Sequence, residues 1–437
     1  MNQLQLFLPC AAGVEDFLAA EVHRVTGLKG DDLLIGRGGV VLRASWRDAL
    51  LLNLHSRLAQ RVLVQLSHTM YRNESDLYAA AGAVAWEIWF TTRQTFKIEV
   101  TAQHSPLKSL NFAALKIKDA VADRFRSKGG ERPSVDTTWP DVRIYAHLTT
   151  DSATLYIDTS GEPLFKRGWR EDKGEAPLKE TLAAAMIEAS GWGDRMRNSA
   201  ADAKAAPPLY DPCCGSGTIA IEAAQMACNI AAGSFRRFGF EQLLPHQPHV
   251  WTGLKQEAQA ARVVRHPSIF GSDVAHRMVD FAQRNAGRAG VGDVVQFRGG
   301  DALQRMPPSE APGVMLLNPP YGERIAVAGV AGEASEDVAR FGARESAQTD
   351  DGGEFFPQQA THWKRNYSGW TGWILTPDLK LPSKMRLKES RRVPMWNGPI
   401  ECRLFRFDMV KGSARARPGA GAKRGQIPIQ DNGRSGA

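Results

Sequence analysis

The chain has 437 residues, of which 43% are hydrophobic and 23% charged, a composition typical of a globular protein with two or three domains. No apolar run approaches the roughly 20 residues of a membrane-spanning helix, and the N-terminus shows no signal-peptide pattern, so we expect a cytoplasmic protein with no membrane partner. The five cysteines form no C-x-x-C pair and no zinc-ligand spacing, so we expect reduced thiols and no metal site. The net charge of +8 indicates a polyanionic partner only weakly.

Residues 1–65 are predicted to form a small α+β segment. The sequence indicates a strand at 3–9, a helix at 14–25, a hairpin at 34–45 and a second helix at 46–59. Glycines at the centre of the hairpin supply its turn.

Residues 66–165 repeat this style, with a strand at 95–103, a helix at 111–129 and a hairpin at 143–161 that turns at 150–152. The helix ends at glycine and carries a series of basic side chains: Lys116, Lys118, Arg124, Arg126 and Lys128. Such a helix suits binding to an RNA backbone, although a solvated face is the commoner explanation for a charged helix.

From residue 166 the pattern changes to strand, glycine turn and helix, which is typical of a parallel α/β sheet. We expect residues 166–410 to form this domain, with apolar strands that include 207–211, 268–273, 294–299 and 314–317, and later ones at 372–377 and 401–409. Residues 326–353 are small and polar and are predicted to be a flexible insertion. Residues 411–437 are predicted to be a disordered basic tail.

The loop DPCCGSGT, from Asp211 to Thr218, is the first motif with chemical meaning. Gly215 and Gly217 let the backbone turn tightly and approach a ligand, and the following helix offers its N-terminus to a negative group, such as a carboxylate of a bound cofactor. The loop lacks the Walker lysine and a third glycine, which disfavours nucleoside triphosphate cleavage. A purely structural strand–helix turn is the alternative.

Two aspartates follow at the ends of the next two strands. Asp273 is placed to accept the ribose hydroxyls of a nucleoside, and Asp301 to accept its adenine amine. Either could instead cap a helix. Together with Asp211 they form an ordered series that favours a nucleoside cofactor.

The sequence Asn318, Pro319, Pro320, Tyr321 follows the apolar strand VMLL. An exocyclic amine is a poor nucleophile because its lone pair is delocalised into the base. The Asn318 side-chain oxygen and the Pro319 carbonyl can accept its two hydrogens and so orient it for attack on a methyl group. Tyr321 can stack on a base withdrawn from its helix. The alternative is a proline-rich strand end with a surface tyrosine.

These motifs, DPCCGSGTIAIEAA with NPPYGER, resemble those of the THUMP-containing class I RNA methyltransferases that modify guanine N2. The likeness is greatest to the N-terminal half of the fused bacterial 23S ribosomal RNA methyltransferases. It covers nearly residues 1–410 and includes the stretches 116–136, 153–170, 176–187 and 396–408.

The resemblance implies a ferredoxin-like segment over 1–65, a THUMP RNA-binding domain over 66–165 and a Rossmann-like class I methyltransferase domain over 166–410. It implies S-adenosylmethionine as the cofactor and methylation of guanine N2 in 23S ribosomal RNA or a large-subunit assembly intermediate. The cofactor role then falls on Asp211, Gly215, Gly217, Thr218, Asp273 and Asp301, with Glu180 and Thr181 in a segment that closes over the cofactor. The catalytic role falls on Asn318, Pro319, Pro320 and Tyr321.

Two departures limit the comparison. The fused relatives carry a second methyltransferase domain where this chain has its basic tail, so a second methylation at guanine N7 is not carried over. The insertion at 326–353 has no counterpart. Three alternatives stay open: a tRNA guanine-N2 methyltransferase, a DNA adenine methyltransferase and a non-catalytic RNA-binding ribosome-assembly factor.

Overall fold

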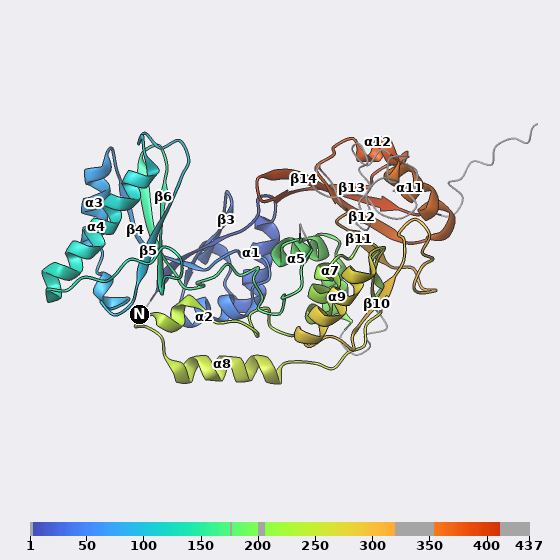
Figure 1. Cartoon of the computed structure of the whole chain (residues 1–437), viewed down its shortest axis with the longest axis horizontal. Helices are drawn as coiled ribbons and strands as arrows, with labels where there is room; N and C mark the ends of the chain where they lie inside the picture. Colours follow the sequence, from blue (N-terminus) through green and yellow to red (C-terminus); the bar gives the residue numbers. More distant parts are fainter. Residues whose placement is uncertain (1–2, 175–176, 200–205, 320–353, 411–437) are drawn as a thin grey trace, which may run out of the picture.

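The computed structural model describes residues 3–174, 177–199, 206–319 and 354–410. Two seven-stranded sheets organise these residues. Figure 1 shows the first sheet, built from the N-terminal part of the chain, on the left and the second sheet on the right. This order confirms the prediction of an α+β module that precedes an α/β domain.

The first sheet has the strand order β2-β3-β1-β4-β7-β6-β5. Its strands are β1 (Leu4–Pro9), β2 (Leu33–Gly36), β3 (Gly39–Ala44), β4 (Leu63–Met70), β5 (Phe96–Ala102), β6 (Val142–Leu148) and β7 (Ser152–Asp158). The predicted hairpins form as β2–β3 and β6–β7. β4 pairs with both β1 and β7 and so joins the two predicted segments into one sheet. Nothing in the sequence had indicated β4, and the predicted boundary at residue 65 falls within it.

Four helices accompany this sheet: α1 (Glu15–Thr26), α2 (Trp46–His55), α3 (Glu74–Ala83) and α4 (Leu110–Gly129). α2 begins with a capping box, in which the Ser45 hydroxyl accepts from the Asp48 amide and the Asp48 carboxylate accepts from the Ser45 amide. α4 was predicted to end at Gly129, and the structure confirms this end. Gly130 caps the helix, and its φ of +79° is the left-handed conformation that ends many helices.

The basic series on α4 is partly neutralised by neighbouring carboxylates. Arg124 donates two hydrogen bonds to Glu87, at 3.1 and 2.5 Å. Arg126 pairs with Asp123 at 2.9 Å, and Lys118 pairs with Asp119 at 2.9 Å. The helix therefore presents less net positive charge than its sequence suggests, and its role in RNA binding stays a prediction.

The second sheet has the order β10-β9-β8-β11-β12-β14-β13. Its strands are β8 (Leu209–Asp211), β9 (Ile269–Asp273), β10 (Val295–Gly299), β11 (Val314–Leu317), β12 (Thr371–Thr376), β13 (Arg391–Asn397) and β14 (Ile400–Asp408). The first five strands in chain order are parallel, and β14 lies antiparallel between β12 and β13. The strand order reverses between β8 and β11, and open α/β sheets bind ligands outside the carboxyl ends of the strands at such a point. The predicted Rossmann-like fold is therefore confirmed.

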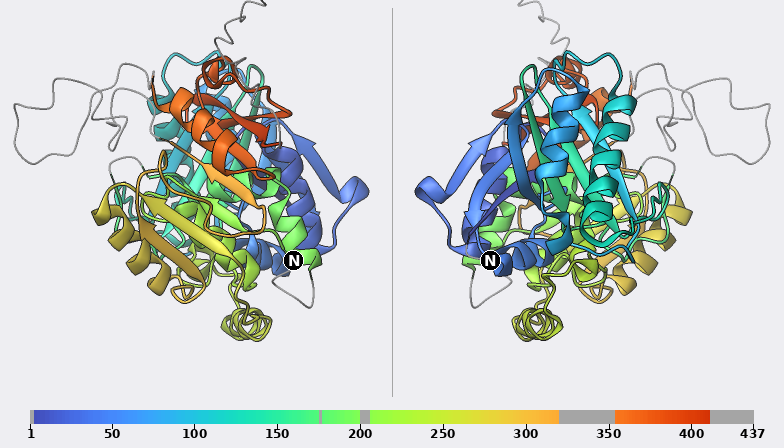
Figure 2. Two further views of the ribbon diagram at one scale, coloured as in Figure 1. Left: turned by 90° about the vertical axis from the view of Figure 1, so that its right-hand side faces the viewer. Right: turned by 90° about the vertical axis from the view of Figure 1, so that its left-hand side faces the viewer.

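Alternate residues of these strands pack into two separate cores. On one face, Leu209 and Leu316 pack against α5 (Glu180–Ala189), α6 (Trp192–Asn198), α7 (Thr218–Ala227) and α9 (His276–Arg288). On the other face, Tyr210 and Met315 pack against α11 (Phe355–Asn366) and α12 (Leu381–Met385). The β10–β11 connection, residues 300–313, contains no helix. α8 (Pro248–Ala260) buries Trp251, Leu254 and Ala258 in the same core as Leu209, and it is seen end-on at the bottom of Figure 2.

A buried ion cluster joins the N-terminal module to the second sheet. Glu222 on α7 is fully buried and accepts from Arg57, which follows α2, at 2.8 Å and from Arg167 at 3.0 Å. Arg57 is also held from its own side, because its amide donates to the buried Glu21 at 2.8 Å. The helix that follows the glycine loop is thereby fixed to the N-terminal module.

Candidate active site

The glycine loop has the predicted placement, since β8 ends at Asp211 and α7 begins at Thr218. Gly215 and Gly217 adopt φ values of +52° and +88°, which side chains disfavour. Space is also closed at Gly217: an added Cβ would lie 3.0 Å from both the Ala282 Cβ and the Phe297 ring. Gly217 thus allows both the turn and the close approach of α7 to α9.

Asp273 holds the glycine loop against β9. Its carboxylate accepts from the Gly215 amide at 2.9 Å and from the Ala275 amide at 3.0 Å. Burial raises its pKa, and these two hydrogen bonds oppose that rise. A carboxylate oxygen can accept more than one hydrogen bond, so this geometry leaves capacity for ligand hydroxyls.

Asp211 and Asp301 flank Asp273 on the neighbouring strands. Asp211 is 2% exposed and accepts from the Cys213 amide at 3.1 Å. Burial raises its pKa well above the ordinary value, and the nearby Asp273 raises it further. Asp301 follows β10 and accepts from the Leu303 amide at 2.8 Å. The three predicted aspartates therefore lie at one edge of the sheet, and the carboxylate of each accepts a hydrogen bond from a nearby backbone amide.

Arg170 is a site residue that the motif analysis missed. Its guanidinium donates to the Thr218 hydroxyl at 2.7 Å, to the Ser216 hydroxyl at 3.2 Å and to the Glu180 carboxylate at 2.8 Å. The predicted Glu180 is 3% exposed and contacts the glycine loop only indirectly, through Arg170. Burial raises the pKa of the Glu180 carboxyl, and the charge of Arg170 opposes that rise. Thr181 is buried beside it at the start of α5. The resemblance over 153–170 contained Arg170, but only the fold reveals its partners.

Asn318 directly follows β11, whose four residues are all buried. The strand register pairs Met315 with Tyr210, which places Asn318 at the same edge as the loop after Asp211. The Asn318 side-chain oxygen is buried and accepts no hydrogen bond within the described ranges. A buried oxygen without a hydrogen bond carries an uncompensated desolvation cost, so binding of a ligand that donates a hydrogen bond to it is favourable. Pro319 is buried, whereas Pro320, Tyr321 and the insertion at 326–353 lie outside the described residues.

The described part of the chain contains no group of three or more His, Cys, Asp or Glu side chains that could hold a metal ion. None of the helices within those ranges is both long enough and apolar enough to cross a membrane. All five cysteines are free thiols.

Three family models match the chain. They are the RlmL ferredoxin-like domain at residues 5–63, the THUMP domain at 71–158 and the RMKL-like methyltransferase domain at 167–333. The ribosomal RNA large subunit methyltransferase K/L of Psychromonas ingrahamii is 36% identical over 428 residues, which cover 96% of this chain and 52% of the relative. The chain therefore spans about half the length of the curated relatives that it matches.

Solved structures share the whole arrangement. SMU.472, which carries a provisional methyltransferase assignment and is complexed with SAH, superposes with a TM-score of 0.77 at 26% identity, over 95% of this chain and 100% of the other. A protein from Listeria monocytogenes str. 4b F2365, predicted to be an N6-adenine-specific DNA methylase, superposes with a TM-score of 0.75 at 28% identity, over 93% and 96%. The chain is thus composed of an RlmL ferredoxin-like domain, a THUMP domain and an RMKL-like methyltransferase domain, in that order.

Proposed function

We propose that this chain transfers a methyl group from S-adenosylmethionine to the N2 amine of a guanine in 23S ribosomal RNA, either in the RNA itself or in a large-subunit assembly intermediate. The observation that carries the proposal is the buried, unpaired oxygen of Asn318 beside the glycine loop. An amine hydrogen of the target base is the donor that this oxygen lacks.

The glycine loop fits the proposed cofactor. An added Cβ at Gly215 would meet only the Met278 side chain, at 3.9 Å, so this side of the loop is open to a ligand. Bound S-adenosylmethionine would supply the methyl group as an electrophile. The N-terminus of α7 would hold its carboxylate, Asp273 its ribose and Asp301 its adenine amine.

Asn318 would act on the base rather than on the cofactor. By accepting from the N2 amine, its oxygen fixes the direction of the nitrogen lone pair and stabilises the positive charge that develops during attack. The Pro319 carbonyl would accept the second hydrogen. Because the amine proton becomes acidic as the new bond forms, solvent can remove it afterwards.

RNA is favoured over DNA because a THUMP domain match covers residues 71–158 and the curated relatives are named ribosomal RNA methyltransferases. The Listeria neighbour, with its predicted DNA adenine specificity, is the counter-example. A guanine in tRNA is the second candidate target, since Asn318 would accept equally from the N2 amine of a guanine in tRNA or in ribosomal RNA. Activity on ribosomal RNA places the protein in the cytoplasm under this proposal.

The decisive experiment compares RNA nucleosides, by mass spectrometry, from cells with and without the protein, and then adds the purified chain to the unmodified RNA. Loss of one N2-methylguanosine from 23S RNA, restored by the chain with S-adenosylmethionine, is expected. A methyl group lost from tRNA instead would overturn the substrate, and no change in any nucleoside would overturn the activity.

Replacing Gly217 with alanine is expected to weaken S-adenosylmethionine binding at least about tenfold, because the new Cβ meets Ala282 and Phe297 at 3.0 Å and the φ of +88° is strained. The matched control is Gly287→Ala within α9, where an added Cβ meets nothing within 4 Å. Calorimetric titration with the cofactor should leave the control unchanged. Equal affinities of the two variants for S-adenosylmethionine would contradict the assignment of Gly217 to the cofactor site.

A further inference from the structure

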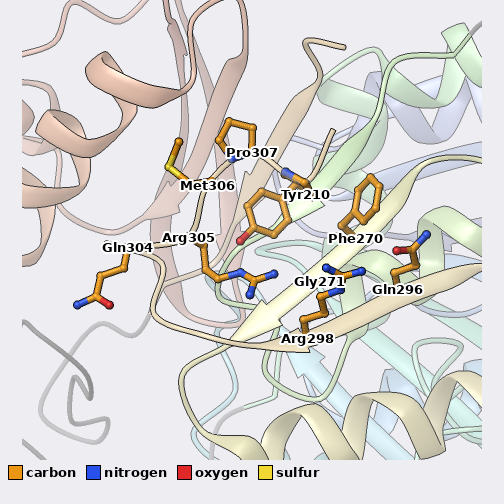
Figure 3. Close-up of a pocket in the computed structure, with 10 residues that line it drawn as sticks. Tyr210, Phe270, Gly271, Gln296, Arg298, Gln304, Arg305, Met306 and Pro307 are labelled. Carbon is orange, nitrogen blue, oxygen red and sulfur yellow. The ribbon is translucent and has the colours of Figure 1, made fainter. Parts of the chain in front are cut away.

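A cavity of about 450 Å³ lies against β8, β9 and β10. It is lined by Tyr210, Phe270, Gln296, Arg298 and Arg305, and by the loop that continues to Pro308. Figure 3 shows these side chains together with the loop that crosses them. Among the described residues, none of those assigned above to the cofactor or to the catalytic loop lines this cavity.

The cavity exists because no helix follows β10 in the described residues 300–313. Parallel sheets are normally covered on both faces and carry apolar residues there. In β10 the residues alternate, with Val295 and Phe297 buried toward α9 and Gln296 and Arg298 exposed on the opposite face. The β10 part of this face is therefore polar and basic, while the neighbouring strands contribute Tyr210 and Phe270 to the same cavity.

Two arginines give the cavity its charge. Arg298 makes no hydrogen bond or ion pair within the described residues. The Arg305 guanidinium donates to the Gly299 carbonyl at 3.2 Å and also interacts with the Tyr210 hydroxyl. Their guanidinium groups point into the space between them (Figure 3). The described residues that line the cavity include no aspartate or glutamate. Convergent guanidiniums without a carboxylate form a pair suited to a phosphate group, whose oxygens accept several N–H donors at once.

The cavity borders the candidate active site through the loop that carries Arg305. The Arg305 amide donates to the Asp301 carbonyl at 2.9 Å, so Arg305 lies one turn after the proposed adenine contact. Its own carbonyl accepts from the Tyr367 hydroxyl at 2.8 Å and from His362 at 2.7 Å, which anchors the loop to α11 and the segment after it. A group bound in this cavity would therefore lie next to the loop that follows Asp301, which is anchored to α11.

We propose that this cavity binds a backbone phosphate of the RNA substrate, at a nucleotide away from the target base; this inference rests on the proposed function. An RNA strand is favoured over a free nucleotide because the mouth is open to solvent: Arg298 is exposed and Met306 is 61% exposed. A continuous strand could cross such a mouth. Phosphate contacts of this kind position a nucleic acid without reading its sequence.

The test substitutes Arg298→Ala and measures RNA affinity at several salt concentrations. Arg305 is left in place because its side chain packs over Gly300 and supports the loop. Loss of one phosphate contact should weaken RNA binding about tenfold and reduce the slope of log affinity against log salt by about one. S-Adenosylmethionine affinity, and turnover at saturating RNA, should equal those of the wild type.

The matched control is Arg277→Ala on α9. Arg277 is also exposed and lies over the Phe281 ring at 5.0 Å, away from the cavity. An equal effect of both substitutions, or no effect of either, would overturn the inference, as would Arg298-dependent binding of AMP or pyrophosphate with unchanged RNA affinity. Arg298-dependent RNA binding by a chain that transfers no methyl group would support the inference and contradict the proposed function.

Discussion

Asn318→Ala is expected to slow methyl transfer about a hundredfold to a thousandfold, the usual effect of removing one preorganised polar group that stabilises a transition state. Affinity for S-adenosylmethionine should remain unchanged, because the side-chain oxygen has no partner among the described residues and is assigned to the base. The measurement is single-turnover methylation of unmodified 23S RNA, with cofactor affinity determined separately by calorimetry.

Asn318→Asp is the matched variant, since it has the same shape and keeps an oxygen that can accept from the amine. It should retain more activity than the alanine variant. If alanine and aspartate lose activity equally, shape or charge at this position matters more than hydrogen-bond acceptance. Near-normal turnover of Asn318→Ala would falsify the catalytic assignment.

The second large effect is expected for stability, from Glu222→Gln. Glu222 is fully buried between Arg57 and Arg167, which are 8% and 1% exposed, and removing its charge leaves two buried guanidiniums without a counter-ion. Breaking a buried ion pair in this way costs about 3–5 kcal/mol. Denaturant unfolding, followed by tryptophan fluorescence, should show an earlier transition that includes the catalytic domain.

The matched control for Glu222 is Glu257→Gln, which removes an exposed pair with Arg47 at 3.3 Å. Exposed pairs contribute about 0–1 kcal/mol, so unfolding of this variant should differ little from the wild type. Equal unfolding curves for the Glu222 and Glu257 variants would mean that the buried cluster does not stabilise the junction between the two sheets.

The contribution of Glu222 should also depend on pH. Burial raises the pKa of this carboxyl, but Arg167 and Arg57 outweigh burial, so its pKa is lowered in the folded protein. A group with a depressed folded pKa contributes stability that is fully present above its unfolded pKa, near 4.3, and lost as pH falls through the folded value. The stability difference between wild type and Glu222→Gln should therefore be constant near neutral pH and shrink below about pH 4. If the stability difference persisted undiminished to pH 2, it would arise from packing rather than from the charge of Glu222.

The second sheet was predictable where its signals are local. The apolar strands that end in Asp211 and Asp273, and the one that ends just before Asn318, are short, continuous stretches, and the glycine loop specifies its own turn. Two strands with weak local signals, β4 and β13, were not found. β4 is apolar only in its first half and forms because β1 and β7 lie on either side of it. β13 contains Pro394, which argues against a strand but is tolerated because β13 is the edge of the sheet.

The site shows the same limit. The motif residues with local signatures come together at one sheet edge, but Arg170, which joins the glycine loop to Glu180, belongs to no recognisable motif. The basic helix was seen in the sequence, whereas its partial neutralisation by Glu87 required the short segment Trp86–Ile88, after α3, to be placed against α4. Ion pairs between segments distant in the sequence decide the local charge of a surface, whereas composition gives only the net charge of the chain.

The shared strand β4 limits where the N-terminal module can be divided. A truncation at residue 65 would cut within a strand that bonds to β1 on one side and β7 on the other, and would expose two unpaired sheet edges that invite aggregation. Residues 3–158 are therefore expected to fold as one unit, although two separate family models describe them. Any fragment designed to isolate the RNA-binding part of the chain should keep the whole first sheet.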